Sequence, residues 1–479
     1  MSRKASLTKK IAHTLLAMSI VYSSGINIVV NEVYAAETTK NLTNSDASFE
    51  EKGEDGKNWS SINPGDITDG KDAIINGKIT DVTIRNAIEV TATGGDGGND
   101  NGGSPTVMLG AKGGDAVARV TVDESLSSVE TGNITVTATG GRNGSVYQGV
   151  SQVAGAAAAY GIEVKHDLTI TAADITVSAK SEFNLISTNK VDIGGAKHSN
   201  AIAAGLQVDD GTVIFSGGKM KVSAQSSNNV FGLDEVYEGP TKFADGGDAE
   251  AYGIRVTGGE ATATLTGILE IESAEGSRGN GRLNGEAVSG LTHTVDGGAG
   301  GNAVAYGVEV NGGIAHLDLQ DISIKQSGSS NYISGGAGGD AAGTAVESVV
   351  TGHGGAGGNA NVAGVHIVSG KADGTIGNIA IETFCHKASG GKGGAVINSL
   401  SGSGGAGRGH NHGSGRLYET QQKPYRGHAG HRPAADTDAG KAPVIHSEPV
   451  LYGSGDYGNG SGQHNGQLLH PHCLPGGGI

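Results

Sequence analysis

An eight-residue segment at 157–164, AAAYGIEV, recurs along the chain and constrains its fold more than any other feature. Close copies lie at 249–256 and 303–310, and weaker copies lie at 201–208 and 360–367. Their fifth residue is always glycine: Gly161, Gly205, Gly253, Gly307 and Gly364. The spacing of these glycines grows from 44 to 57 residues along the chain. Self-similarity at this spacing indicates a repeat array rather than one globular core.

Each repeat carries three short runs in which apolar and polar residues alternate. In the clearest repeat these runs are 162–164, 168–170 and 175–177. The third run recurs seven times, beginning at residues 88, 134, 175, 220, 269, 322 and 379. Alternation buries one face of a strand and leaves the other in water. The pattern therefore predicts an all-β fold, a right-handed parallel β-helix (β-solenoid). It disfavours a β-sandwich, which would show short hairpin turns and no long-range repeat.

The segments between repeats are rich in glycine, which contributes 86 of the 479 residues. The motif GGxGG[ND]A at 297–303, 335–341 and 354–360 indicates glycine-rich loop insertions that leave the stack on one side. It is similar to nonapeptide calcium repeats, which need a large apolar residue where alanine follows Asn302 and Asp340 here. Plain glycine loops are therefore favoured over calcium sites. Glycine ahead of the first run, as at Gly161, is expected to serve a turn that needs positive φ.

The N-terminus is typical of a secretory signal peptide. A basic start through Lys10 precedes an apolar stretch and a small-residue exit that favours cleavage after Ala35, with Ala36 next. Polar residues interrupt this stretch, so it is too short for a membrane anchor. We predict a signal peptide over 1–35, a flexible lead-in and cap over 36–63, a solenoid over 64–400 and a disordered tail over 401–479. Trp59 is expected to cover the first open coil.

Charge and cysteine content exclude two classes of function. A net charge of −16 argues against nucleic-acid binding, which needs clustered lysine and arginine. Cys385 and Cys473 lie far apart and predict neither a disulfide framework nor a paired-cysteine metal site. No glycine loop ends in the lysine and hydroxyl residue of a phosphate site. We expect no cofactor and no metal.

Three groups of residues are candidates for chemistry, and none predicts a catalytic site. Aspartates at the predicted corners are expected to bond their own turns. A nucleophile elbow at Gly402-Ser403-Gly404 lies in a low-complexity Ser-Gly run. Eight of the 16 histidines follow residue 408, and they are too irregularly spaced for a metal site. The corner aspartates are Asp167, Asp174, Asp209, Asp210, Asp318 and Asp321, and the histidines are His410, His412, His428, His431, His446, His464, His470 and His472.

The chain changes character at about Arg408, where the Val/Ile-Thr alternation ends. A disordered extension or a shifted reading frame would each explain the change. Before that point, the signal peptide and the coiled Val/Ile/Thr/Gly/Asn-rich body resemble the passenger region of Gram-negative autotransporter adhesins. This resemblance implies export to the outer surface and display of a β-helix. The family's C-terminal β-barrel has no counterpart in the tail, which lacks a series of alternating strands of about ten residues.

These observations predict a secreted or cell-surface protein, associated with the outer membrane, that is structural or adhesive and not an enzyme. Its repeat loops would bind glycans or proteins of a host or neighbouring cell. No nucleic-acid partner is expected, and no membrane-spanning segment in the mature chain. The alternatives are a secreted β-helix polysaccharide lyase or hydrolase and a truncated, inactive passenger fragment.

Overall fold

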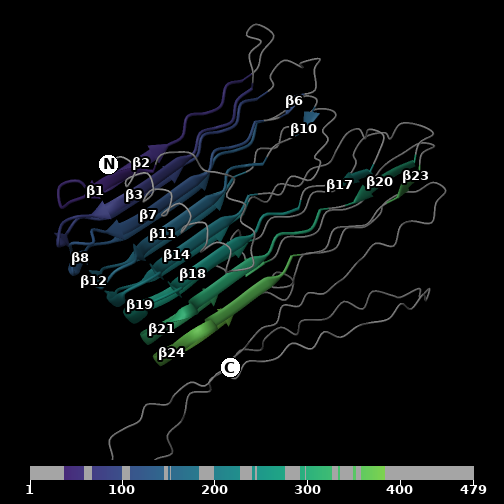
Figure 1. The fold of residues 1–479 in the computed structure, drawn as a ribbon. Helices are drawn as coiled ribbons and strands as arrows, with labels where there is room; N and C mark the ends of the chain where they lie inside the picture. Colours follow the sequence, from purple (N-terminus) through teal and green to yellow (C-terminus); the bar gives the residue numbers. More distant parts are fainter. Residues whose placement is uncertain are drawn as a thin grey trace, which may run out of the picture.

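The chain folds into a stack of parallel β-strands, seen in a computed structural model (Figure 1). The structure describes residues 37–58, 67–99, 108–109, 111–144, 149–150, 153–182, 199–226, 240–242, 245–275, 292–296, 298–325, 333–334, 349–351 and 358–382. The predicted signal peptide, Trp59, both cysteines and the tail lie outside these residues. All pairings in the main, 19-stranded sheet are parallel. The fold is a parallel β-helix, as the repeats predict.

Each turn of the helix, which we call a rung, carries a first, a second and a third strand. The first strands are β1 (Thr38–Leu42), β3 (Ala73–Ile79), β7 (Ala116–Val122), β11 (Ala157–Val164), β14 (Ala201–Val208) and β18 (Ala249–Val256). The second strands are β4 (Thr83–Ile84), β8 (Ser128–Thr131), β12 (Leu168–Ala172) and β15 (Thr212–Gly217). The third strands are β2 (Ser48–Lys52), β5 (Ile88–Thr93), β9 (Ile134–Gly140), β13 (Ile175–Ser181) and β16 (Met220–Gln225).

Toward the C-terminal end of the stack the strands of a rung merge. Strand β19 (Glu260–Glu275) covers the second and third positions, and β21 (Ala303–Lys325) and β24 (Ala360–Glu382) each cover all three. The short β22 (Ile333–Ser334) pairs with the end of β19. The octapeptide copies coincide with first strands β11, β14 and β18. Strands β1 and β2 pair with β3 and β5, so the stack begins within the predicted lead-in and cap.

The third strands stack in the register that the sequence repeat predicts. Ile88 pairs with Ile134, and the row continues through the first residue of every later third run. That row is completed by Ile175, Met220, Leu269, Ile322 and Ile379. A one-residue slip would turn each apolar row outward, so the alternating pattern fixes the register.

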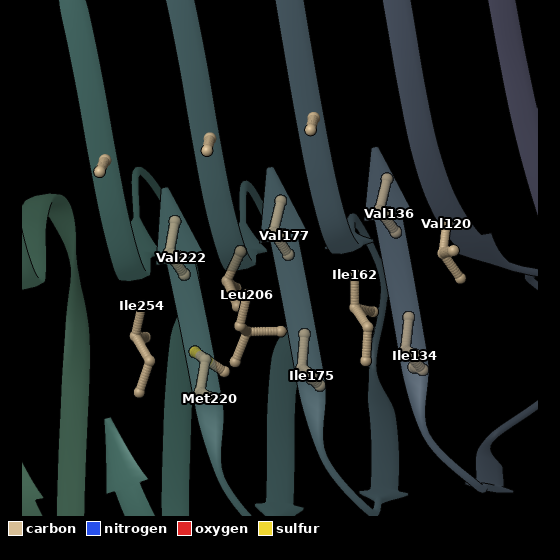
Figure 2. Close-up of a cluster of buried hydrophobic side chains, with 14 of the residues drawn as sticks. Val120, Ile134, Val136, Ile162, Ile175, Val177, Leu206, Met220, Val222 and Ile254 are labelled. Carbon is tan, nitrogen blue, oxygen red and sulfur yellow. The ribbon is translucent and has the colours of Figure 1, made fainter. Parts of the chain in front are cut away.

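The core is a thin layer between the first and the third strands (Figure 2). Ile162 of β11 and Leu206 of β14 face Ile175 and Met220 of the third strands (Figure 2). All four side chains are buried, with exposures of 0–1%. Aliphatic side chains make up most of the core, to which Phe215 of β15 adds a buried aromatic ring, so a chain with only 4% aromatic residues forms a continuous core.

The glycines of the octapeptide have a different role from the one predicted. Gly161 lies inside β11 and is not among the positive-φ glycines. Its Cβ would lie 2.8 Å from a methyl carbon of Val177, so close approach across the core excludes a side chain. The positive-φ positions lie mainly at the corner between first and second strands, as at Gly211 (φ 82°) and Gly259 (φ 66°).

Glycine-rich segments leading into and out of the rungs extend the stack beyond the strands. The Gly94 N–H donates to a backbone carbonyl oxygen of the next rung, 2.9 Å away. The Gly95 N–H donates to a backbone carbonyl oxygen of the segment that leads into its own rung, 2.8 Å away. Gly97 and Gly98 repeat this alternation three residues later. Extended chains with a three-residue period resemble polyproline II helices, here joined by hydrogen bonds between neighbours. The described parts of the glycine insertions are therefore ordered layers.

Side chains are sterically excluded from this glycine layer. A Cβ on Gly141 would lie 2.0 Å from the carbonyl oxygen of Gly95, and one on Gly301 would lie 1.9 Å from that of Gly247. Such distances are far below van der Waals contact. Gly301 and Gly358, the described glycines of GGxGG[ND]A for which this contact is seen, are therefore required by the packing.

Beyond the glycine layer, small sheets join neighbouring insertions. Strand β6 (Met108–Leu109) pairs with β10 (Gly149–Val150). Strands β17 (Pro240–Lys242), β20 (Thr292–Asp296) and β23 (Val349–Thr351) form a three-stranded parallel sheet. Both lie to one side of the main stack (Figure 1).

Candidate functional site

The predicted corner aspartates bind structural partners. Asp167, Asp174 and Asp321 each accept a 2.8 Å hydrogen bond from a backbone N–H of the next rung. We predicted bonds within the same turn, and only Asp210 makes one, with the Gly211 N–H at 2.8 Å. The difference arises because rungs stack about 4.8 Å apart, which brings the next corner within reach of an aspartate side chain.

The two other corner aspartates bind side chains. Asp209 Oδ1 accepts hydrogen bonds from Thr257 Oγ1 at 2.7 Å and from Gln207 Nε2 at 3.0 Å. Burial raises the pKa of Asp209. Asp318 Oδ1 accepts from Thr375 Oγ1 of the next rung at 2.9 Å. None of the six aspartates is left facing solvent as an unpaired acid.

The asparagine and aspartate of the glycine motif form a second ladder. Asn200 Oδ1 accepts from the Asp248 N–H at 2.8 Å, and Asp248 Oδ1 accepts from the Asn302 N–H at 2.7 Å. Asn302 Oδ1 then accepts from the Asn359 N–H at 3.0 Å. The side-chain oxygens of this ladder thus accept hydrogen bonds between rungs. No group of three histidine, cysteine or acidic side chains in the described residues could hold a metal ion.

A row of buried polar residues marks the outer side of the first strands. Glu250 and Tyr252 of β18 are 4% and 3% exposed, and Tyr306 and Glu309 of β21 are 8% and 6% exposed. Outward residues of a solvent-facing strand are normally wet, as on the third strands. This row is the most unusual polar feature of the described residues.

Hydrogen bonds and an ion pair connect the row across two rungs. Tyr252 Oη donates to Glu250 Oε2 at 2.7 Å, and Arg255 Nε donates to Glu309 Oε2 at 2.8 Å. The Arg255 guanidinium carbon lies 4.5 Å from the centre of the Tyr252 ring, a cation–π distance. Opposite charges in register on neighbouring strands stabilise their pairing.

Burial changes the acidity of these groups in different directions. It raises the pKa of Glu250, and it raises the pKa of Tyr252 well above its usual value. Burial also acts to raise the pKa of Glu309, but His366 and Arg255 outweigh it and the pKa is lowered. Burial therefore acts against ionisation of Glu250, whereas His366 and Arg255 favour the ionised form of Glu309.

Aromatic rings continue the row to the last rung. The rings of Tyr252 and Tyr306 meet edge to face with centroids 6.0 Å apart. The imidazole of His366 is tilted against Tyr306 with centroids 4.3 Å apart. Its Nδ1 lies 3.7 Å from Glu309 Oε1, which is too long for a hydrogen bond.

A second charged group lies on the same side, nearer the N-terminal end. Arg119 Nη1 donates to Glu163 Oε2 at 3.3 Å, and Arg119 Nη2 donates to Glu37 Oε2 at 2.8 Å. Lys165 also contacts Glu163. Burial raises the pKa of Tyr160 to about 12. Burial acts against ionisation of Glu163, but Arg119 and Lys165 outweigh it and lower its pKa.

The outer side of the third strands is open and rich in hydroxyl groups. Thr135 of β9 and Thr176 of β13 are exposed and lie in register. Thr91, Thr137 and Ser178, two positions along their strands, are half-buried. We call these five residues the hydroxyl face. It gives the stack a polar surface that is exposed at Thr135 and Thr176.

Sequence reasoning missed the buried row, although the repeats carried a signal for it. Arg255 and Glu309 occupy the seventh position of successive octapeptides. Alignment of the copies therefore places an arginine beside a glutamate and one tyrosine beside another. The predicted elbow at Gly402–Gly404, Asp340 and the histidine tail lie outside the described residues.

Comparison of the chain with protein-family models, with curated proteins and with solved structures gave no match. No helix within the described ranges is long and apolar enough to cross a membrane.

Proposed function

We propose that this chain is an exported cell-surface protein with a structural and adhesive role, similar to an autotransporter passenger. The observation that carries the proposal is the contrast between the two sides of the third strands. Inward residues repeat as aliphatic rows, whereas the outward row changes from Glu89 to Thr135 and on to Lys221. A constant scaffold with a variable exterior suits display of binding residues.

Adhesion on such a scaffold would use many weak contacts. The hydroxyl face offers polar groups at the regular spacing of the rungs, about 4.8 Å. The ligand class that fits is a repeating polar surface, such as cell-surface glycans or proteins. Linked copies of weak contacts gain avidity without any single strong site. The acidic surface disfavours nucleic acid as the partner.

The test compares dense and sparse display of the protein. The chain from Ala36 onward, coupled to beads at high density, should bind glycan and cell-surface arrays far more strongly than the soluble protein. Thr135→Glu, on the hydroxyl face, should weaken this binding. Thr169→Glu is the matched control because Thr169 is an exposed threonine on second strand β12. Equal loss in both variants, or no binding at either density, would count against adhesion and favour an inactive fragment.

The export component of the proposal has its own test. Expression of the whole chain in a Gram-negative host should release a mature N-terminus at Ala36 or Glu37. N-terminal sequencing of the secreted or surface-bound protein would detect it. Retention of Met1 in the cytoplasmic fraction would contradict export.

A polysaccharide lyase or hydrolase is the second candidate, and one observation favours it. The buried row concentrates two acids, two tyrosines and an arginine on neighbouring rungs, which are residue types that such enzymes use. Against it, each of these groups is paired with another, and the Arg255 side chain is only 13% exposed. Cleavage of acidic or neutral polysaccharides, abolished by Glu250→Gln, would support the enzyme.

A further inference from the structure

A histidine on the outer side of the second-strand positions lies between two acids of different rungs. His316 of β21 is in register with Thr262 of β19 and with Asp373 of β24. Its Nδ1 lies 2.5 Å from Asp373 Oδ1, and its Nε2 lies 3.3 Å from Oε1 of Glu260, which begins β19. One imidazole ring therefore contacts carboxylates of the rungs before and after its own.

This geometry requires a protonated ring if both contacts are to be hydrogen bonds. An ionised carboxylate only accepts, so each ring nitrogen must carry a proton to bond its acid. The imidazolium ion has two N–H donors, whereas the neutral ring has one N–H and one lone pair. A neutral ring thus turns a lone pair toward one of the two carboxylates, and that contact becomes repulsive. Histidine is the side chain that ordinarily changes charge between about pH 5 and 8.

The groups around the ring keep the acids as acceptors and leave the ring open to protons. Lys371 Nζ lies 2.6 Å from Asp373 Oδ2. Lys371 and His316 lower the pKa of Asp373, so this carboxyl stays ionised at mildly acid pH. Asp318, the next outward acid of β21, bonds Thr375 instead of the ring. The His316 side chain is 38% exposed, so solvent exchanges protons with it directly.

We propose that Glu260, His316 and Asp373 form a proton-dependent clamp across the rungs of β19, β21 and β24. At mildly acid pH the imidazolium bonds both acids and joins the three rungs. As the pH rises toward 8 the ring loses a proton, one contact is lost, and the rungs separate more readily at their second-strand positions. The contribution of the clamp to stability is therefore present in acid and is lost as the pH rises. This inference does not depend on the proposed adhesive function.

Hydrogen exchange of the full-length protein between pH 5.5 and pH 8 tests the clamp, after correction for the intrinsic pH dependence of amide exchange. Protection of the amides of 371–376 should fall by about twofold to tenfold over this range, which is the worth of partly exposed ion pairs. The amides of β9 and β13 serve as the reference within the same molecule, and their protection should change less. Protection of 371–376 that falls no more than that of β9 and β13 would overturn the inference.

Variants separate the clamp from other titrations. Glu260→Gln should reduce the pH dependence at 371–376, because its amide can donate to Nε2 of the neutral ring while the Nδ1–H bonds Asp373. His316→Gln should abolish the contribution of the clamp. Glu130→Gln is the matched control and should keep the wild-type change, because Glu130 is an exposed acid of second strand β8 whose register partners are threonines. His366→Gln should also keep it, since His366 lies on the first-strand side beside Glu309. A full wild-type change in Glu260→Gln or His316→Gln would overturn the inference.

Discussion

A Cβ on Gly253 of β18 would lie 2.5 Å from a methyl carbon of Leu269 in the facing third-strand position. The same Cβ would lie 2.5 Å from the carbonyl oxygen of Gly307 in the next rung. The first strand thus approaches both the opposite wall and its neighbour too closely for any side chain. This contact explains why every octapeptide has glycine at its fifth position.

Gly253→Ala should destabilise the fold by about 1–3 kcal/mol, because the added methyl group overpacks a tight core. The backbone carbonyl of Gly307 cannot move aside as a flexible side chain could. Urea unfolding followed by circular dichroism would measure the change. Gly267→Ala is the control, since its Cβ would meet atoms no closer than 3.0 Å. Equal destabilisation in both variants would contradict the role assigned to Gly253.

Asp174→Ala should cost about 0.5–1.5 kcal/mol, the net value of one hydrogen bond. The substitution leaves the Lys219 N–H of the next rung without its acceptor. Asp174→Asn should restore most of the loss, because an asparagine, Asn133, has the same role in the preceding rung, where it accepts from the Asp174 N–H at 3.2 Å. Chemical unfolding of the two variants would compare them. A loss in Asp174→Asn as large as that in Asp174→Ala would argue against the ladder.

Arg255→Met should destabilise the protein by about 3–5 kcal/mol, because Glu309 would remain as a buried charge without its partner. The two side chains are only 13% and 8% exposed, so water cannot replace the arginine. The double variant Arg255→Met/Glu309→Leu should recover much of this loss. A double-mutant cycle by chemical unfolding would measure the coupling. Additive effects of the two substitutions would contradict a direct pair.

Glu250 should make stability depend on pH in the acid to neutral range. Its pKa is raised by burial from 4.5, so the folded protein keeps a proton that the unfolded chain has lost. This contribution is complete below about pH 4.5 and is lost as the pH rises through the folded-state pKa. Glu250→Gln removes the ionisation, so its stability relative to wild type should increase between acid and neutral pH.

Tyr252→Phe provides the second arm of the pH experiment. The Tyr252 hydroxyl donates to the Glu250 carboxylate and lowers its pKa, in opposition to burial. Its removal should make the loss of stability with rising pH larger. Thermal unfolding at a series of pH values would measure both variants. A difference between wild type and Glu250→Gln that does not change with pH would contradict the assignment.

The fold could be predicted from the sequence because each repeat packs only on its neighbours in the stack. Ile88, Ile134 and Ile175 begin runs with the same inward residues, and these runs stack on one another in register. The paired strands are far apart in the sequence, yet the repeated pattern of apolar residues indicates which strands pair. The glycine layer was harder to predict, because its hydrogen bonds join segments from neighbouring rungs and have no alternation of side chains to mark them.

The buried row could not be predicted from one repeat alone. Its pairs join Arg255 with Glu309 and Tyr252 with Tyr306, which are neighbours only after the rungs are stacked. The burial of Glu250 depends on the packing around β18, and an alternating strand pattern places that residue in solvent. The greater exposure of Ile379 than of Ile322 likewise becomes visible only when equivalent residues of successive rungs are compared.

Spin-label distances along one outward row test the central claim, the in-register stacking of parallel rungs, most directly. Labels would be placed at Glu89 and at Glu270 or Ala380, which occupy the same position of the third strand, with Cys385 and Cys473 replaced by serine. At about 4.8 Å per rung, the distances from Glu89 should be about 19 Å and 29 Å, each with a narrow distribution. Distances that do not grow with the number of rungs would contradict the β-helix.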